Sequence, residues 1–244
     1  MTRELTGVEG PHADATLETG GAPAAAARVA LILVHGRGGT PEGMIRLADE
    51  LYVPGTALFA PGAVRSNWFP AAHDAPIEVN EPALTSAVDC VAETVDAARG
   101  IGLDFEQIVL VGISQGGSVV GEFLRRHPRR YGGAFVISAA LPGPTVETFA
   151  TEESGTERIG TTVKQDPESI ATLDGTPVTL ESSENDPYVS SERVRTTAAT
   201  FEQRGASVDL RIDDGDEHGV SESMIERIAA HLEILRDRAT TESA

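Results

Sequence analysis

Three side chains suited to nucleophilic catalysis lie far apart in this sequence. Ser114 stands in the motif GISQGG (residues 112–117), after an apolar run and before a helical pattern. A serine hydroxyl attacks a carbonyl group only when a base removes its proton, and histidine is the usual base. A carboxylate that orients the histidine completes such a catalytic group. Ser114 is therefore a candidate nucleophile that needs one histidine and one acid beside it.

His218 and Asp186 are the residues best placed to serve as base and acid. His218 lies in the acidic loop DGDEHG (residues 214–219), between the last predicted strand and the last predicted helix. Asp186 comes shortly after a predicted strand at residues 176–181. The alternatives are a surface histidine and a turn-forming aspartate. Three nearby acids remain rivals of Asp186: Glu184, Asp213 and Asp214.

Two glycine-rich segments could together form an oxyanion hole. Glycines two residues before and after Ser114 fit a tight strand–turn–helix, which directs helix amides towards the substrate oxygen. The segment HGRGG (residues 35–39) ends an earlier apolar run. We expect the backbone amides of Arg37 and Gln115 to be the two donors, and His35 to hold its loop by hydrogen bonding. A phosphate-binding loop is excluded, because the closing Lys and Ser/Thr are missing.

Apolar runs and helical periodicity alternate along the chain and predict the scaffold. Strands are predicted at residues 28–34, 56–60, 107–113, 133–138, 176–181 and 207–212. Helices are predicted around residues 84–98, 119–124, 194–201 and 221–235, the last capped by Ser221. This alternation predicts an α/β fold with a mostly parallel central sheet and helices on both faces. The carboxyl ends of parallel strands share one edge, where the three candidate residues would meet.

A single domain is predicted for residues 28–238. Residues 1–27 are small and polar, and we expect a loose start with at most one short edge strand. Residues 239–244 form a polar tail that we expect to fray. The proline-containing stretch 141–174 predicts a long excursion over the sheet edge, suited to act as a partial lid.

The composition excludes several classes of function. The formal net charge is −19, and only one basic residue is a lysine. Such a surface repels nucleic acid and anionic membranes, and it is similar to that of proteins from salt-loving archaea. Cys90 is alone, so we expect no intrachain disulfide, and it sits in a helical pattern as a small buried hydrophobe. We expect no metal site, no membrane span and, without an apolar leader, a cytoplasmic location.

Four motifs together resemble the phospholipase/carboxylesterase family of α/β-hydrolases. They are LVHGRGG (33–39), GISQGG (112–117), SENDPYV (183–189) and GDEHGV (215–220), and the resemblance covers about residues 28–237. The resemblance implies the same nucleophile, acid, base and oxyanion donors. It also implies that the segment NWFP (67–70) borders an acyl pocket. The sequence departs from the family where Ser190 replaces a common proline and where residues 151–164 have no obvious counterpart.

Three apolar residues are candidates for the substrate pocket. Trp68, Phe69 and Leu141 are candidates to border the acyl pocket, although each also suits the core. Met224 is expected to belong to the core.

The resulting hypothesis is a serine hydrolase that cleaves small carboxylic esters or thioesters through an acyl-enzyme, without metal or organic cofactor. The alternatives are a dienelactone-hydrolase-like enzyme, whose relatives carry cysteine at the elbow, and a non-catalytic binding protein on the same scaffold. A peptidase is also possible on this fold. Monomer and homodimer both remain open.

Overall fold

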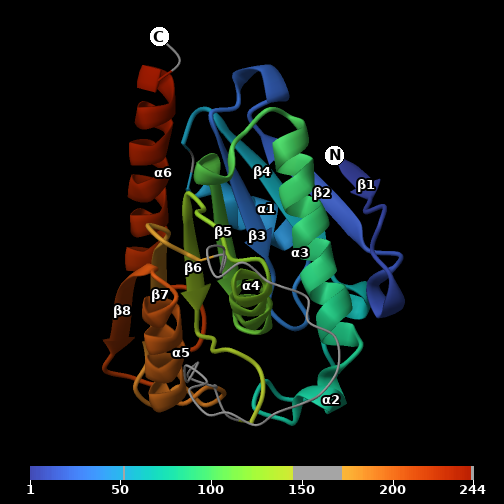
Figure 1. Cartoon of the computed structure of the whole chain (residues 1–244), viewed down its shortest axis with the longest axis vertical. Helices are drawn as coiled ribbons and strands as arrows, with labels where there is room; N and C mark the ends of the chain where they lie inside the picture. The colour runs from blue at the N-terminus through green and yellow to red at the C-terminus, as the bar shows by residue number, and fades with distance from the viewer. Residues whose placement is uncertain (52, 145–171, 243–244) are drawn as a thin grey trace, which may run out of the picture.

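The computed structural model describes residues 1–51, 53–144 and 172–242. Its strands form one eight-stranded sheet in the order β1-β2-β4-β3-β5-β6-β7-β8 (Figure 1). The pairs from β4–β3 to β7–β8 are parallel, whereas β1–β2 and β2–β4 are antiparallel. The mostly parallel α/β sheet predicted from the sequence is confirmed.

Most predicted elements are found within a few residues of their expected bounds. The strands are β1 (Thr2–Glu4), β2 (Thr16–Gly21), β3 (Val29–Val34), β4 (Thr56–Gly62), β5 (Ile108–Ile113), β6 (Gly133–Ile137), β7 (Pro177–Ser183) and β8 (Ser207–Asp213). The α-helices are α1 (Pro41–Asp49), α2 (Ile77–Asn80), α3 (Ala83–Gly100), α4 (Gln115–Arg126), α5 (Ser191–Gln203) and α6 (Glu222–Glu242). Ser221 caps α6 as predicted, since its Oγ accepts a hydrogen bond of 3.0 Å from the amide of Met224.

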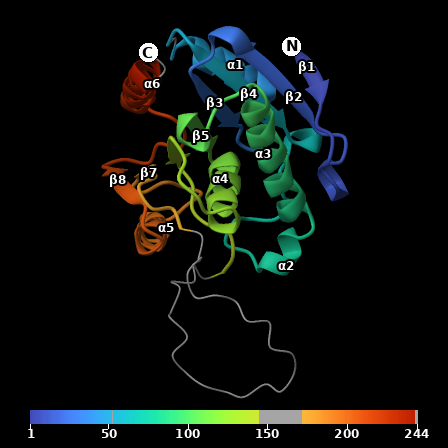
Figure 2. The ribbon, with the colours of Figure 1, turned by 45° about the horizontal axis from the view of Figure 1, so that its top comes forward.

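Helices cover both faces of the sheet and divide the core into two layers. Every side chain of β3 is buried, and alternate ones face opposite layers. Residues of α3, α4 and α5 pack on one face, and residues of α1 and α6 pack on the other. Met224 is fully buried in the second layer, as predicted. Figures 1 and 2 show α3 and α4 side by side, with α6 apart from them.

The two ends of the described chain differ from the sequence prediction. Residues 1–27 supply two strands, not at most one, and β2 pairs along its whole length with β4. Their mixed polar pattern reflects their exposure, because β1 is the edge strand and β2 lies beside it. Helix α6 continues past the predicted end at Arg238 to Glu242, because Ala239 is buried against its neighbours. Helices α1 and α2 were not predicted.

The predicted excursion at 141–174 lies mostly outside the described residues, as do the 151–164 segment and residues 243–244.

Cys90 is buried in α3, as predicted, and burial raises the pKa of its thiol to about 12.

Candidate active site

Ser114 occupies a strained turn between β5 and α4. Its backbone has φ 53° and ψ −122°, a region that side-chain-bearing residues rarely adopt. A Cβ on Gly112 would lie 2.7 Å from the Cα of Gly117, and a Cβ on Gly116 would collide with the carbonyls of Val34 and His35. Only glycine allows so close an approach. The turn therefore explains the glycine spacing around Ser114.

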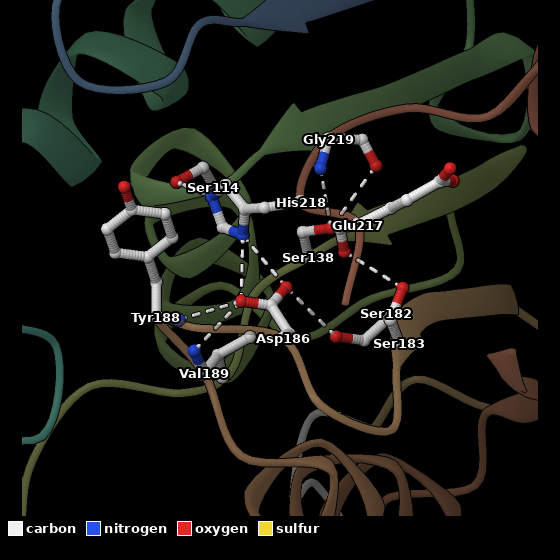
Figure 3. A network of polar contacts seen from close by, with 10 residues as sticks. All are labelled: Ser114, Ser138, Ser182, Ser183, Asp186, Tyr188, Val189, Glu217, His218 and Gly219. Carbon is white, nitrogen blue, oxygen red and sulfur yellow. Dashed lines mark hydrogen bonds and ion pairs between the residues drawn. The ribbon is translucent and has the colours of Figure 1, made fainter. Parts of the chain in front are cut away.

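The structure brings Ser114, Asp186 and His218 together at the carboxyl edge of the sheet (Figure 3). His218 Nε2 lies 2.8 Å from Ser114 Oγ, and its Nδ1 lies 2.8 and 3.0 Å from the two carboxylate oxygens of Asp186. An ionised carboxylate only accepts hydrogen bonds, so Nδ1 carries the proton and donates it. Nε2 is then free to accept the hydroxyl proton of Ser114. This is the geometry that general-base activation of a serine requires.

Asp186 is held by the backbone as well as by His218. Its side chain is fully buried, and its Oδ1 accepts hydrogen bonds from the amides of Tyr188 (2.9 Å) and Val189 (3.2 Å). These donors offset the cost of burying a carboxylate. The rival Glu184 pairs instead with Arg195 at 2.8 Å. Among the candidate acids, Asp186 is therefore the one that contacts the imidazole.

Two serines that the sequence analysis missed hold the loop of His218. Ser183 Oγ donates a hydrogen bond of 2.8 Å to the carbonyl of Glu217. Ser138 Oγ accepts one of 3.0 Å from the amide of Gly219. The residues on both sides of His218 are thus fixed to the ends of β6 and β7. Their only sequence signal is a serine at the carboxyl end of an apolar strand.

The buried side chain of Glu181 also supports the loop that contains His218. Glu181 lies near the end of β7, and burial raises the pKa of its carboxyl. It accepts a hydrogen bond of 2.9 Å from Ser221 Oγ, the cap of α6. This contact ties the start of α6 to the sheet just after the His218 loop.

The glycine loop after β3 lies beside Ser114. A Cβ added to Gly36 would lie 3.3 Å from the Cβ of Ser114, so the residue that precedes Arg37 packs against Ser114. Gln115 is the first residue of α4, where amides have no acceptor within the helix. Within the described residues, the amides of Arg37 and Gln115 donate to no protein acceptor. Both amides are therefore available to a substrate oxygen.

The side chains of these same two residues hold the aromatic loop that follows β4. Arg37 donates hydrogen bonds to the carbonyls of Phe69 (3.1 Å) and Ala71 (3.0 Å). Gln115 accepts from the amide of Trp68 (2.8 Å) and donates to the carbonyl of Phe69 (2.7 Å). The candidate oxyanion residues and the aromatic loop form one connected unit.

Trp68 is an internal support within this unit. Its side chain has no exposed surface, and its indole N–H donates to the carbonyl of His35 at 2.8 Å. Phe69 and Leu141 are also buried. The structure thus favours a supporting role for Trp68 over direct contact with a substrate. A pocket role for Phe69 and Leu141 stays a prediction.

Two buried histidines bind the backbone of the aromatic loop at Trp68 and before it. His35 Nε2 accepts from the amide of Ala63 (3.1 Å), so the expected loop-holding role of His35 is confirmed. His12 Nε2 donates to the carbonyl of Trp68 (2.8 Å), while its Nδ1 accepts from the amide of Val64 (3.3 Å). Burial lowers the pKa of both imidazoles, which keeps them neutral and able to accept.

Neither a metal cluster nor a membrane helix is found in the described part of the chain. No group of three or more His, Cys, Asp or Glu side chains there could hold a metal ion. No described helix combines the length and the apolar character needed to cross a bilayer.

Comparisons with known proteins agree with this architecture. The family model described as Phospholipase/Carboxylesterase matches residues 20–236. A crystal structure of a phospholipase/carboxylesterase from Dyadobacter fermentans superposes with a TM-score of 0.75 at 29% identity, covering 88% of this chain and 95% of that one. A Bacillus cereus carboxylesterase superposes with a TM-score of 0.64 at 20% identity, covering 91% and 93%. The second likeness shows the fold alone.

A curated relative from rice, Oryza sativa subsp. japonica, is described as a probable inactive carboxylesterase. The two sequences are 29% identical over an alignment of 133 residues. The match covers 46% of this chain and 53% of that protein. The chain thus spans about half the length of the curated relative that it matches.

Proposed function

The chain belongs to the phospholipase/carboxylesterase family of α/β-hydrolases, and we propose that it is a serine hydrolase of carboxylic esters or thioesters. Family and fold support a hydrolase. The serine mechanism rests on one observation above all, the hydrogen-bonded chain from Ser114 through His218 to Asp186. No metal or organic cofactor enters the proposed reaction.

In the first half-reaction, Ser114 Oγ attacks the carbonyl carbon while His218 Nε2 takes the hydroxyl proton. The carbonyl oxygen becomes an oxyanion that accepts hydrogen bonds from the amides of Arg37 and Gln115. Asp186 stabilises the imidazolium and keeps its ring oriented. His218 then gives the proton to the leaving oxygen or sulfur, the bond from the carbonyl carbon breaks, and an acyl-enzyme remains.

In the second half-reaction, water replaces the leaving group. His218 takes a proton from the water, whose oxygen attacks the acyl carbon of the ester on Ser114. The same two amides accept the second oxyanion. The proton returns from His218 to Ser114 Oγ as that bond breaks, and the carboxylic acid is released. The group is then ready for another turnover.

A non-catalytic binding protein is the second candidate, and the rice relative described as probably inactive is the observation that favours it. A binding protein does not require a nucleophile, base and acid in hydrogen-bonding contact. In this chain all three are present and joined. A dienelactone-hydrolase-like enzyme is less well supported, because the elbow residue is serine and Cys90 is buried in α3.

Hydrolysis of p-nitrophenyl butyrate by the wild type and by Ser114→Ala tests the proposal. We expect Ser114→Ala to lose roughly 10³-fold or more in kcat while it keeps its thermal unfolding transition. The buried Ser118→Ala, one turn further along α4, is the matched control and should retain activity within about threefold. An unchanged rate in Ser114→Ala, or no hydrolysis of any ester or thioester by the wild type, would overturn the proposal.

A further inference from the structure

We propose that the ring of Tyr188 forms the binding site for the leaving group, a neutral or cationic alcohol or thiol with an apolar, preferably aromatic, body. This inference deepens the proposed function and rests on it. Tyr188 lies on the loop between β7 and α5, two residues after Asp186. Its ring centroid is 4.7 Å from that of His218, with the ring planes tilted by 59°. Figure 3 shows the phenol ring alongside the imidazole.

The exposure of this ring is unusual for its size and position. Tyr188 is 71% exposed, and only a few large hydrophobic residues of the described chain are comparably open to solvent. Tyr188 is the one of them that contacts the candidate catalytic group. A single exposed side chain is ordinary, but this ring contacts the candidate general base, so a ligand that reaches His218 can also contact the exposed ring.

The backbone at Tyr188 is held by hydrogen bonds that do not involve the phenol ring. The amide of Tyr188 donates to Asp186 Oδ1 at 2.9 Å, and the amide of Val189 donates to the same atom. Both donors are backbone N–H groups, so neither bond involves the phenol ring. The phenol ring is therefore not needed to hold the acid, and its role must be sought on its exposed side.

The chemistry of the reaction identifies which part of a substrate meets this ring. His218 Nε2 must protonate the leaving oxygen or sulfur, so that atom has to lie against the imidazole. The centroids of the imidazole and phenol rings are 4.7 Å apart, so the two rings are in contact and a group bound at the imidazole is within reach of the phenol ring. The body of the leaving group therefore lies near the phenol ring, whereas the acyl oxygen is directed to the amides of Arg37 and Gln115.

Charge near the ring restricts the leaving group further. The loop that contains His218 carries three acids with exposed side chains: Asp214, Asp216 and Glu217. Glu184, four residues before Tyr188, is paired with Arg195 at 2.8 Å, so the negative charge beside the site comes from the His218 loop. The carboxylates of this loop repel an anionic leaving group and tolerate a neutral or cationic one. An aromatic face also attracts cations and other rings.

The test compares wild type, Tyr188→Ala and the matched control Tyr188→Phe on two series of esters. One series keeps the butyryl group and varies the alcohol: methyl, benzyl and 4-carboxybenzyl. The other keeps the benzyl alcohol and varies the acyl group: acetyl, butyryl and octanoyl. We expect Tyr188→Ala to lower kcat/KM for benzyl butyrate about three- to tenfold more than for methyl butyrate. Tyr188→Phe should stay within about twofold of wild type throughout.

Acyl transfer supplies a second readout that a purely structural role would not move. By microscopic reversibility, an alcohol that attacks the acyl-enzyme binds where the leaving group departed. Tyr188→Ala should therefore lower the ratio of benzyl transfer to hydrolysis by a similar factor, and leave methanol transfer unchanged. This ratio does not depend on how much protein is folded.

The possible outcomes separate this inference from the proposed function. Equal losses on every ester, an altered acyl-chain preference, or an unchanged transfer ratio would overturn the leaving-group site and leave the esterase intact. Better hydrolysis of the 4-carboxybenzyl ester than of the benzyl ester by wild type would overturn the charge argument. No hydrolysis of any ester by wild type would remove the proposed function, and this inference with it.

Discussion

At the scale of single residues, the site depends on a buried carboxylate held from two directions. Both carboxylate oxygens of Asp186 lie within hydrogen-bonding distance of His218 Nδ1. Its Oδ1 also accepts hydrogen bonds from two backbone amides. A neutral amide in its place would retain the size of the side chain. It would present either an N–H to Nδ1 or a weaker acceptor, so the imidazole would lose its fixed tautomer and the charge that stabilises it.

Asp186→Asn should therefore lower kcat by about 10³–10⁴-fold while leaving KM within a few-fold. Asp214→Asn is the matched control, because Asp214 is an exposed acid on the same edge and was a rival from sequence. It should stay within about twofold of wild type. Steady-state hydrolysis of p-nitrophenyl butyrate measures both. Equal losses in the two variants would point to the overall charge of the edge and contradict the specific role of Asp186.

The sequence shows which residues could react but not all that surrounds them. Ser114, Asp186 and His218 were predicted because each has a characteristic residue type after a strand. Ser138 and Ser183 were missed, since their role depends on which loops lie opposite them in space. Trp68 was a candidate for the pocket border or the core, and it lies inside the protein, where its indole N–H donates a hydrogen bond to the carbonyl of His35.

At the scale of elements, two buried histidines clamp the aromatic loop. His12 and His35 each accept a hydrogen bond from a backbone amide, and burial lowers the pKa of each below its ordinary value of 6.5. Below pH 6.5 the unfolded chain binds protons at these positions that the folded chain does not bind. Their stabilisation is therefore present above pH 6.5, and it is lost as the pH falls through the folded-state pKa.

We expect the free energy of unfolding, measured in urea with molar KCl, to fall between pH 7 and pH 5. Molar salt screens the acidic surface, whose own titration would otherwise obscure the effect. His12→Gln should make this slope shallower, because it removes one titrating group and retains a donor and an acceptor. An identical slope in wild type and His12→Gln would contradict this account of the clamp.

Strands with an apolar run and helices with an apolar period were predictable, whereas the two N-terminal strands were not. Strands β3 and β5 are buried almost throughout, so their sequences identify them directly. Strand β1 is an exposed edge strand and its neighbour β2 is mostly half-buried, so their polar sequences hide their pairing. Helix α1 has a recognisable N-terminal signal, because Thr40 caps it and Pro41 is its first residue. Its apolar face is short, so the helical period was not detected.

At the scale of the whole molecule, the parallel sheet converts distant sequence positions into one site. Ser114 and His218 are 104 residues apart, yet each follows a strand whose carboxyl end reaches the same edge. The surface around this scaffold is strongly acidic, with a formal net charge of −19. Repulsion among these charges opposes the compact state, and salt weakens it.

The melting temperature should rise by about 4–8 °C between 0.1 and 2 M KCl, which for this size corresponds to roughly 2 kcal/mol. Differential scanning calorimetry measures the shift. Sucrose solutions of matched osmolality serve as the control, since sucrose favours burial without screening charge. A melting temperature that is flat in KCl, or that rises equally in sucrose, would contradict electrostatic self-repulsion as the cause.

Labelling of the native protein with a fluorophosphonate tests the central claim most directly, because this reagent reacts covalently with a serine hydroxyl that a nearby base activates. We predict a single adduct, located on Ser114 by mass spectrometry of the digested protein. The adduct should be absent in Ser114→Ala, strongly slowed in His218→Ala and absent after heat denaturation. A native protein that stays unlabelled, or that carries its adduct on another serine, would contradict the account.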